Sequence, residues 1–422
     1  MASFAAPLAV VILAGTVVLI AWRPLGLREG LAATLGASLM IVAGLAGLAD
    51  VGQAARDTAG IMVFLVGMMI VATVADEAGF FEWVAAGAIR SAKGRGRLLY
   101  VYLYLLGAMI TLFLSLDVTA IIFTPIVCAL ALRLRLKPLP FVLSSAFVAN
   151  SASLVLPVSN LTNMLVYDLL GIDFWAFVRH LVLPNLVALG INLGVFLLLF
   201  RKQIPRLYSM EKQAEPEVNQ QFRVVAGLGL GLVVVGLLIA GFAGWPLWTV
   251  AVLGAVGLSG IGLWWGQIDV GTLRRGIAWQ LPFFVVGMYV VVAAVNRVAL
   301  SALWTDLLST CQAHQGVGAL VLAFGTGAGA NLVNNLPMSL VAIGALKTLG
   351  AGHDVLSFAA LIGTNLGPNV TVFGSLATML ILQSARRRGI QVSAGEYLRI
   401  GVLTTPPMIL AATLVLVVNA PA

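Results

Sequence analysis

The sequence is poor in charge and in residues that bind metals. Charged side chains make up 9% of the 422 residues, and there are two cysteines, Cys128 and Cys311, and three histidines. The cysteines stand far apart, so no disulfide or zinc framework follows, and one chain cannot capture a soft metal with three thiolates. The motifs His-Glu-x-x-His and Gly-x-Ser-x-Gly and any clustered acid pair are missing. We therefore expect neither an intramembrane enzyme nor a bound cofactor or metal.

Long polar segments are also scarce. Hydrophobic residues account for 61% of the chain and the mean hydropathy is +1.05, values that exclude a soluble globular domain. They indicate an all-α polytopic membrane protein embedded in lipid. At about 20 residues a span, the length allows roughly a dozen crossings. The formal charge of +8 comes from basic residues between apolar spans, which orient the protein in the membrane rather than bind nucleic acid.

Apolar runs define the predicted spans, and one long polar stretch divides them. Residues 201–221 form that stretch, which we predict to be a cytoplasmic linker between two halves, 1–200 and 222–422. The predicted spans lie at about 8–21, 31–48, 59–75, 98–114, 118–132, 140–157, 181–200, 222–241, 247–264, 276–295, 315–331, 336–346, 356–384 and 397–418.

Two of the apolar runs are interrupted by polar residues. The run 359–382 contains Gly367-Pro368, which cannot continue a helix, and backbone groups freed at bilayer depth must be satisfied in protein or in a wet cavity. Paired interruptions of this kind in two halves of a chain indicate the binding site of a secondary transporter. A shift of 215 residues matches the run 148–166 with 363–381 and pairs Asn150 with Asn365, Asn160 with Ser375, and Asn163 with Thr378.

The similarity extends beyond the interrupted runs. Asp50-Val-Gly-Gln-Ala-Ala-Arg56 and Asp269-Val-Gly-Thr-Leu-Arg-Arg275 each follow the second span of their half. The basic loop 90–97 corresponds to 305–312, which has no basic residue, so equivalent loops face opposite sides of the membrane. The sequence therefore predicts two inverted-topology repeats, each with a re-entrant hairpin and a broken transmembrane helix.

The distribution of Lys and Arg predicts the orientation. If the N-terminus is outside, 20 of the 24 basic residues fall inside, the bias expected of a prokaryotic inner (plasma) membrane protein. We predict that both the N-terminus and the C-terminus are outside. This distribution of Lys and Arg requires that residues 98–132 and residues 315–346 each form a hairpin that enters and leaves the membrane at the same face. The first apolar segment, Leu8 to Ala21, has no basic residue ahead of it and is expected to be a retained span.

One carboxylate, Asp117, is flanked by apolar runs on both sides. An ionised carboxylate within the membrane costs about 2.5–3.5 kcal/mol or more, which favours the protonated form and allows proton exchange near neutral pH. We predict that Asp117 is the proton-coupling residue of a proton-coupled carrier. The alternative is a structural role, in which Asp117 caps the helix that begins at Val118.

Amides and hydroxyls dominate the polar residues around the interruptions. No Lys or Arg lies within a span nearby, so a carboxylate substrate would lack a cationic partner, and a small neutral polyol-like solute or a bare cation is favoured. A nucleotide is not expected at the glycine-rich segment 325–337, because no Lys follows at P-loop spacing. Some of these side chains could instead satisfy broken backbone or join helices. The predicted substrate-binding residues are Asn150, Ser159, Asn160, Thr162, Asn163, Asn334, Asn335, Thr364, Asn365, Asn369, Ser375 and Thr378.

The run Gly363-Thr-Asn-Leu-Gly-Pro-Asn-Val-Thr-Val-Phe-Gly-Ser-Leu-Ala-Thr378 closely resembles arsenite efflux permeases of the ArsB type, within the ion transporter superfamily. The likeness covers essentially the whole chain. Family members have an Asp where Asn365 stands and a Lys where Asn369 stands, so two amides replace a charge pair here. They also have an Asn where Leu116 precedes Asp117. The likeness is further carried by Arg387-Arg-Gly-Ile390, Gly395-Glu-Tyr-Leu-Arg-Ile-Gly401, Ser159-Asn-Leu-Thr-Asn163 and Asn331-Leu-Val-Asn-Asn-Leu-Pro337.

The resemblance implies a secondary transporter that exports trivalent arsenic, as arsenite and antimonite, in exchange for protons. It also implies a soluble arsenite-stimulated ATPase as a cytoplasmic partner, with the linker and the basic loops as its dock. Arsenous acid is an uncharged trihydroxide at neutral pH and suits a pocket of amides and hydroxyls. We expect alternating access in which arsenite displaces a proton from the region of Asp117, so that substrate and proton compete for one site.

Two other transport functions stay open from the sequence. Ser159-Asn-Leu-Thr-Asn163 offers backbone and side-chain oxygens to sodium, as in a sodium-coupled carboxylate carrier or a sodium/proton antiporter of the same superfamily. Dependence of transport on sodium would distinguish this alternative. A channel for anions or water is a weaker alternative, which would show flux without proton coupling or saturation.

Overall fold

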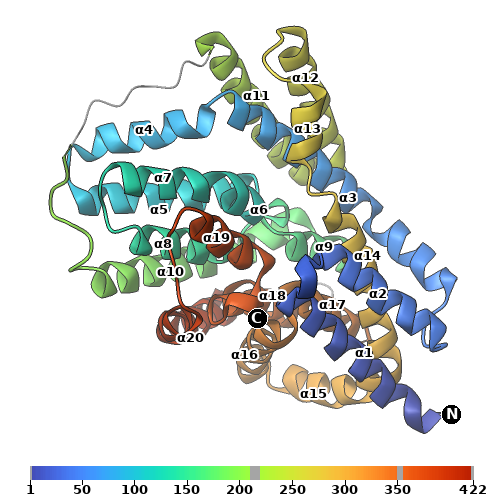
Figure 1. Ribbon diagram of the computed structural model, residues 1–422. Coiled ribbons are helices and arrows are strands. Elements are labelled where there is room, and N and C mark those ends of the chain that lie inside the picture. Colours follow the sequence, from blue (N-terminus) through green and yellow to red (C-terminus); the bar gives the residue numbers. More distant parts are fainter. Residues whose placement is uncertain (1, 210–218, 349–354, 420–422) are drawn as a thin grey trace.

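The chain folds entirely into helices and loops in the computed structural model, which describes residues 2–209, 219–348 and 355–419 (Figure 1). Over these ranges there is no β-strand, and extended backbone pairs only in an isolated bridge between Arg95 and Leu207. Ten helices in the described ranges are long and apolar enough to cross a membrane. The predicted class, an all-α polytopic membrane protein, is confirmed.

The first half of the chain runs to the end of α10. A π-helical turn, Thr119–Phe123, joins α6 to α7 without a break, so the two form one continuous helical segment. The helices are α1 (Ala2–Trp22), α2 (Glu29–Val42), α3 (Leu48–Glu77), α4 (Phe80–Ala92), α5 (Gly96–Phe113), α6 (Leu116–Val118), α7 (Thr124–Arg133), α8 (Leu139–Ser151), α9 (Leu161–Leu170) and α10 (Phe174–Leu199).

The second half begins at α11 and follows a similar order. A second π-helical turn, Asn296–Leu300, lies between α14 and α15. The helices are α11 (Gln220–Ala243), α12 (Leu247–Trp264), α13 (Val270–Gly276), α14 (Gln280–Val295), α15 (Ser301–Ala313), α16 (Gln315–Val333), α17 (Asn335–Thr348), α18 (Val355–Leu366), α19 (Leu376–Arg387) and α20 (Ala394–Asn419).

Helices of the two halves pack against each other rather than forming separate bodies. The most extensive contacts between the halves join α2 with α14, α3 with α12, and α10 with α20. Small residues allow the close approach of the first two pairs. A Cβ atom on Gly67 would lie 2.9 Å from the backbone carbon of Ala251, and one on Gly287 would lie 2.7 Å from that of Ala33. Figure 1 shows α8, α9, α18 and α19 at the centre of the view, between α4, α5 and α7 on one side and α1, α2 and α14 on the other.

Both predicted helix interruptions are present. In the first half α8 ends at Ser151 and α9 begins at Leu161, and in the second half α18 ends at Leu366 and α19 begins at Leu376. The same shift of 215 residues that relates the two sequences relates both pairs of boundaries. The 3-10 turns Pro157–Ser159 and Val372–Gly374 precede the second helix of each pair at the same shift, and the second interruption has a further 3-10 turn, Gly367–Asn369. That the halves are repeats of inverted topology stays a prediction.

Two helical hairpins lie beside the interruptions. The first turns at Ser115 (φ 143°) between α5 and α6, and the second turns at Asn334 (φ 78°) between α16 and α17. Each of these residues supplies a cap: the Ser115 hydroxyl accepts a hydrogen bond from the Val118 N–H at 3.4 Å, and Asn334 Oδ1 accepts one from the Leu336 N–H at 3.4 Å. The cap predicted for Asp117 is therefore made by Ser115, because the helix begins before Val118, at Leu116.

Several predicted spans differ from the helices. The predicted span 59–75 is much shorter than α3, because its first turns carry charged residues that a hydropathy window rejects. Two of those charges have partners within the fold: Arg297 pairs with Asp50 at 3.3 Å, and the Tyr289 hydroxyl donates to Asp57 Oδ2 at 2.6 Å. Likewise α10 begins at Phe174 rather than near 181, and α2 ends at Val42 rather than near 48. The helices α4, α9 and α15 fall outside all predicted spans because they are short or carry charges.

The described part of the predicted linker 201–221 is anchored to the rest of the fold by hydrogen bonds. The Tyr208 N–H donates to the carbonyl of Gly94 at 2.8 Å, and the Gly96 N–H donates to the carbonyl of Arg206 at 3.1 Å. The Tyr208 hydroxyl also donates to the carbonyl of Ile89 at 3.2 Å. This segment is therefore held against the loop between α4 and α5, while residues 210–218 of the linker lie outside the described residues and α11 begins at Gln220.

Candidate functional site

Asn365, the next-to-last residue of α18, is the centre of a buried cluster of amide side chains. Its Nδ2 donates to Asn163 Oδ1 at 2.8 Å, and its Oδ1 accepts from Asn160 Nδ2 at 2.8 Å and from Ser153 Oγ at 2.9 Å. All four side chains are at most 3% exposed. The end of α18 in the second half is thus bonded to the start of α9 and to the segment that precedes it in the first half.

A second group of bonds lies around Asn150, the next-to-last residue of α8. Asn150 Nδ2 donates to Asn369 Oδ1 at 3.1 Å and to Thr378 Oγ1 at 3.0 Å. Asn369 Nδ2 donates in turn to Ser151 Oγ at 2.9 Å. Every one of these bonds joins the first broken helix to the second, so the two interruptions predicted from the sequence meet at one place. We call these residues together the amide cluster: Asn150, Ser151, Ser153, Asn160, Asn163, Asn365, Asn369 and Thr378.

Helix ends add backbone donors to the cluster. Asn160 is the N-cap of α9, where its Oδ1 accepts from the Thr162 N–H at 3.1 Å, and Ser375 is the N-cap of α19. Both α9 and α19 therefore begin at the cluster, and the N-terminus of a helix carries partial positive charge and unpaired N–H groups. None of the cluster side chains is charged, so this site suits a neutral polar guest.

Two polar atoms at the cluster lack partners among the described residues. Asn150 Oδ1 and the Ser375 hydroxyl are both buried, and neither makes a hydrogen bond. Leaving such an atom unsatisfied costs about 1–3 kcal/mol. One acceptor and one hydroxyl are therefore available to a small guest that can both donate and accept hydrogen bonds.

Other predicted site residues serve the backbone. The Ser159 hydroxyl donates to the carbonyl of Leu112 at 2.6 Å, and the Thr364 hydroxyl donates to the carbonyl of Ala360 within its own helix at 3.0 Å. Asn334 Nδ2 donates to the carbonyl of Phe373 at 3.0 Å, which ties the second hairpin to the second interruption. Thr162 and Asn335 are buried, and the Thr162 hydroxyl has no partner among the described residues. The structure brings these residues close to the interruptions, and only the backbone N–H of Thr162 bonds to the amide cluster, at Asn160 Oδ1.

Sequence reasoning missed three residues of this site. Ser151 and Ser153 belong to the cluster, and the alternation of serine and alanine directly after Asn150 in the first interruption was the available signal. Tyr397 of α20 is fully buried, and its hydroxyl lies beside the side chain of Thr378 of the amide cluster. Its ring lies 5.2 Å from that of Phe147, which is on the same helix as Asn150. No local pattern distinguishes this tyrosine from an ordinary membrane-interface aromatic.

Asp117 lies apart from the amide cluster. It lines a cavity of about 210 Å³ together with Asp76 and Glu77 at the end of α3, and with Thr272 and Arg275 of α13. No hydrogen bond among the described residues joins Asp117 to the cluster. The first hairpin directs this carboxylate toward α3 and α13. That substrate and proton compete for one site stays a prediction.

The short helix α13 positions the basic residue of that cavity. Asp269 caps α13 by accepting from the Thr272 N–H at 2.8 Å and from the Thr272 hydroxyl at 3.1 Å. These two bonds hold the pKa of Asp269 below its usual value. Arg275 follows two turns after the cap, and its Nη2 donates back to Thr272 Oγ1 at 2.8 Å. The cavity thus combines three carboxylates with one fixed guanidinium.

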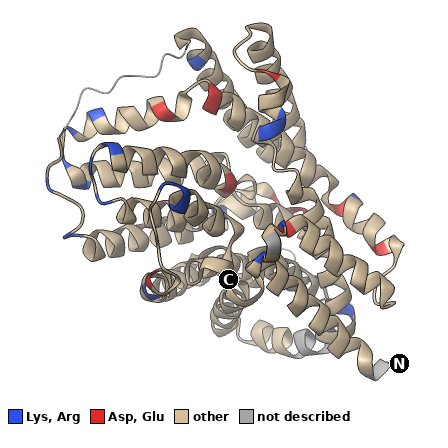
Figure 2. Cartoon of the chain, viewed as in Figure 1, with Lys and Arg blue, Asp and Glu red and all other residues tan. Residues whose placement is uncertain are grey.

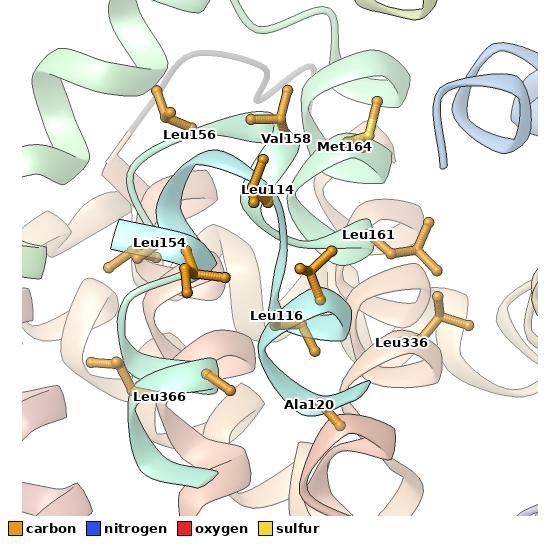
Figure 3. Close-up of a cluster of buried hydrophobic side chains, with 14 of the residues drawn as sticks. Leu114, Leu116, Ala120, Leu154, Leu156, Val158, Leu161, Met164, Leu336 and Leu366 are labelled. Atoms are coloured by element: carbon orange, nitrogen blue, oxygen red, sulfur yellow. The ribbon is translucent and has the colours of Figure 1, made fainter. Parts of the chain in front are cut away.

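Apolar side chains surround the hairpin tips and the interruptions. Figure 3 shows Leu114 and Leu116 of the first hairpin beside Leu154 and Leu156 of the first interruption. Leu336 of the second hairpin and Leu366 at the end of α18 belong to the same buried cluster (Figure 3). This shell excludes water and strengthens the hydrogen bonds inside it. Within the described ranges, no group of three or more His, Cys, Asp or Glu side chains is placed to hold a metal ion.

Two broken helices that meet in a buried polar cluster, flanked by two hairpins, define a membrane transporter. The chain belongs to the arsenical pump membrane protein family, ArsB, whose family model matches residues 8–419. An arsenical pump membrane protein of Escherichia coli is 34% identical over 409 residues, which cover 93% of this chain and 94% of that protein. A putative arsenical pump membrane protein of Bacillus subtilis is 27% identical over 428 residues, with 94% and 95% covered. The relatives are named as membrane pumps, in keeping with a transporter rather than an enzyme.

Solved structures agree on the fold. The YdaH transporter of Alcanivorax borkumensis superimposes with a TM-score of 0.59 at 16% identity, covering 87% of this chain and 86% of that one. MtrF of Neisseria gonorrhoeae, which belongs to a class of antimetabolite efflux pumps, gives a TM-score of 0.56 at 12% identity, with 88% and 83% covered. At these identities the likeness concerns the fold alone.

Proposed function

We propose that the protein exports trivalent arsenic as neutral arsenous acid, and antimonite in the same form, in exchange for protons by alternating access. The observation that carries the proposal is the uncharged, buried amide cluster, above all the bonds from Asn365 to Asn160 and Asn163. Membership in the arsenical pump family supports arsenic as the cargo.

The chemistry of the cluster suits this substrate. Arsenous acid carries three hydroxyl groups, each of which donates and accepts hydrogen bonds, and it has no charge that needs a counter-ion. Asn150 Oδ1 would accept from one hydroxyl and the Ser375 hydroxyl would bond to a second. Asn365 and Asn160, which now bond to each other across the two halves, would each turn one amide group toward the substrate. Binding would therefore replace bonds between the halves with bonds to the guest.

Asp117 is the proposed proton carrier. Because it lines the cavity with Asp76 and Arg275 rather than the amide cluster, proton and substrate would be coupled through the hairpin and not by competition for one atom. The π-helical turn Thr119–Phe123 that follows Asp117 packs against both α8 and α19, which carry the cluster. Movement of this hairpin on loss of a proton would therefore shift the residues that hold arsenous acid.

The exchange would be driven by both components of the proton gradient. Moving a neutral solute outward and a proton inward transfers one positive charge inward in each cycle. A membrane potential contributes about 2.3 kcal/mol per elementary charge for each 100 mV. Export against a concentration gradient would thus continue when the pH difference is small.

The orientation and the partner belong to the same proposal. We place the protein in the plasma (inner) membrane with both termini outside, on the distribution of Lys and Arg. A cytoplasmic arsenite-stimulated ATPase would then meet the basic loops and the segment between α10 and α11. Arsenic transport by the proton route requires no such partner.

Accumulation of arsenite in everted membrane vesicles tests the function. We expect wild-type vesicles to accumulate arsenite when energised and to lose it when a protonophore is added. Asp117→Asn should abolish this accumulation, because an amide in place of the carboxylate cannot release a proton at physiological pH. Asp173→Asn is the matched control, because Asp173 is an exposed N-cap of α10 and asparagine caps a helix equally well.

The same assay decides between the proposal and its rivals. Accumulation that ignores the protonophore but follows a sodium gradient would replace the proposal with a sodium-coupled carrier. Flux that equilibrates arsenite without concentrating it, and does not saturate, would indicate a channel.

A further inference from the structure

A second cavity, of about 280 Å³, lies at the ends of α4, α7, α11 and α19. Three arginines from distant parts of the chain line it: Arg133 at the end of α7, Arg223 in the first turn of α11, and Arg388 directly after α19. The cavity is separate from the amide cluster and from the cavity of Asp117. Nothing in the proposed transport cycle uses it.

The three arginines have no acidic partner within the described ranges. Arg223 lies over the ring of Trp83, with its guanidinium carbon 6.0 Å from the ring centroid, and Arg388 donates to the hydroxyl of Ser384 at 3.1 Å. The one carboxylate of the cavity, Glu82, has a buried Oε2 without a hydrogen-bond partner. Three guanidinium groups against one carboxylate leave the cavity with a net positive charge.

The helix ends that line this cavity lie in a part of the molecule that is rich in basic positions (Figure 2). Lys and Arg positions crowd the part of the view that contains the ends of α4, α7 and α19, while the opposite end around α1 and α2 carries few. Basic residues on one side of a membrane protein mark its cytoplasmic face. The three arginines therefore lie where the anionic headgroups of the inner leaflet are found.

We propose that this cavity binds the phosphate group of an anionic glycerophospholipid, with Arg133, Arg223 and Arg388 as its ligands. Arginine presents a planar fork of donors that matches phosphate oxygens, and basic pockets between membrane helices on the cytoplasmic side bind lipid headgroups. The cavity has three arginines from separate elements against the single carboxylate of Glu82, and no described residue forms an ion pair with these arginines.

The walls of the cavity favour a lipid over free phosphate. Apart from the charged groups and Gly79, the lining is apolar and includes Ile89, Ile126 and Leu130. A free anion would leave this apolar surface in contact with water, whereas a glycerol backbone and acyl chain would cover it. Trp83, which is 45% exposed beside the arginines, is the type of residue that anchors at the membrane–water interface.

The lipid would connect the first hairpin and the second broken helix to α4 and α11. Arg388 follows α19, the second half of a broken helix, and Arg133 ends the helix of the first hairpin. Arg223 and Glu82 belong to α11 and α4, which lie outside both of these units. One phosphate held by all three arginines would hold the hairpin and the broken helix against α4 and α11. Lipid binding itself does not depend on arsenic being the substrate.

Native mass spectrometry of the purified full-length protein, released from detergent micelles doped with defined lipids, tests the site. The probes are palmitoyl-oleoyl phosphatidylglycerol, palmitoyl-oleoyl phosphatidylcholine, and inorganic phosphate without lipid. We expect phosphatidylglycerol to remain bound and phosphatidylcholine to dissociate. Arg133→Gln combined with Arg388→Gln should weaken phosphatidylglycerol binding at least about tenfold, since each lost charge-assisted bond is worth that much. Arg387→Gln is the matched control, because Arg387 is exposed, adjacent in sequence and not part of the cavity.

Each outcome bears directly on the proposal. Loss of bound phosphatidylglycerol in the double variant, with retention in Arg387→Gln, supports it. Equal binding of phosphatidylglycerol to all three proteins, or equal binding of the two lipids to the wild type, overturns it. Thermal stabilisation by millimolar inorganic phosphate that disappears in the double variant, without a preference for phosphatidylglycerol, would show a site for the free ion and would also overturn the lipid assignment.

Discussion

Two amide side chains at the second interruption stand where the resemblance to the family implies a charge pair. Asn365 and Asn369 stand where an Asp and a Lys are expected from the resemblance, and the two amides bond to separate partners in the first half rather than to each other. An Asn offers both a donor and an acceptor, so each can bridge residues of the opposite half without a buried charge. This arrangement keeps the cluster neutral and fits an uncharged substrate.

Ser375 provides the sharpest test at the scale of one residue. Its hydroxyl is buried without a partner, so Ser375→Ala removes an unsatisfied group and should leave the unfolding temperature of the substrate-free protein unchanged or raised. The same change should weaken arsenite binding about tenfold, because the guest loses a hydrogen bond. Thermal unfolding in detergent and equilibrium binding of labelled arsenite measure the two effects.

Ser151→Ala is the contrasting variant. This hydroxyl accepts from Asn369 Nδ2, so its loss leaves a buried amide donor unpaired and should lower the unfolding temperature. If Ser375→Ala instead destabilises the substrate-free protein as much as Ser151→Ala, the Ser375 hydroxyl has a partner in the protein and is not reserved for a guest.

Asp76 is expected to act with Asp117, because both line the same cavity. Asp76→Asn should retain arsenite binding, since the amide cluster is untouched, and should lose at least about tenfold of proton-driven accumulation in everted vesicles. The physical reason is that neutralising one carboxylate changes the electrostatic free energy of charging its neighbour. If Asp76→Asn accumulates arsenite at the wild-type level, Asp76 takes no part in proton coupling.

Glycines fix the distance between α16 and α18 at the scale of elements. A Cβ atom on Gly363 would collide with the carbonyl oxygen of Ala323 and would lie 2.9 Å from the backbone nitrogen of Gly327. Gly363→Ala therefore forces two backbones apart, and overpacking of this kind costs about 1–3 kcal/mol. We expect a lower unfolding temperature in detergent.

Gly325→Ala is the control for that prediction. It lies on α16 as well, but a Cβ atom there meets nothing within 4 Å, and alanine favours a helix over glycine by about 1 kcal/mol. Its unfolding temperature should stay the same or rise. Equal losses in Gly363→Ala and Gly325→Ala would mean that the close approach of α16 and α18 does not limit stability.

The elements that could be predicted are those with a signal inside their own sequence. Gly367-Pro368 inside an apolar run predicts a break in a helix wherever that run lies, and the shift of 215 residues predicts its partner. The start of α3 was missed because its charged first turns fail a hydropathy window. Asp50 nevertheless caps this helix by accepting from the Gly47 N–H at 2.7 Å, and it also pairs with the distant Arg297. The short helices α4 and α9 likewise depend on packing partners that no local pattern reveals.

The site, like the fold, could be predicted only where the signal lies within the interrupted runs themselves. Asn150, Asn160, Asn163 and Asn365 could be expected to meet because both interruptions must satisfy freed backbone groups at the same depth. The direction of the Asp117 side chain could not, since it depends on how the first hairpin sits against α3 and α13.

For the whole molecule, the distribution of Lys and Arg predicts the topology. With both termini outside, 20 of the 24 Lys and Arg residues are predicted to lie on the cytoplasmic side. This prediction requires that the two helical hairpins each return to the face from which they start. Alkaline phosphatase fused after Asn419 should therefore be active, and green fluorescent protein fused at the same position should be dark. A fluorescent fusion with inactive phosphatase would place the C-terminus inside and reverse the proposed orientation.

The central claim is that the amide cluster, and not the cavity of Asp117, holds arsenous acid. Equilibrium binding of labelled arsenite to the purified protein in detergent tests it most directly, with Asn365→Ala, Asp117→Asn and the exposed control Asn419→Ala. We expect binding at least about tenfold weaker for Asn365→Ala, because the substrate loses the amide of Asn365 as a hydrogen-bonding partner, and binding within about twofold of wild type for the other two. Wild-type affinity in Asn365→Ala, or loss of binding in Asp117→Asn alone, would contradict it.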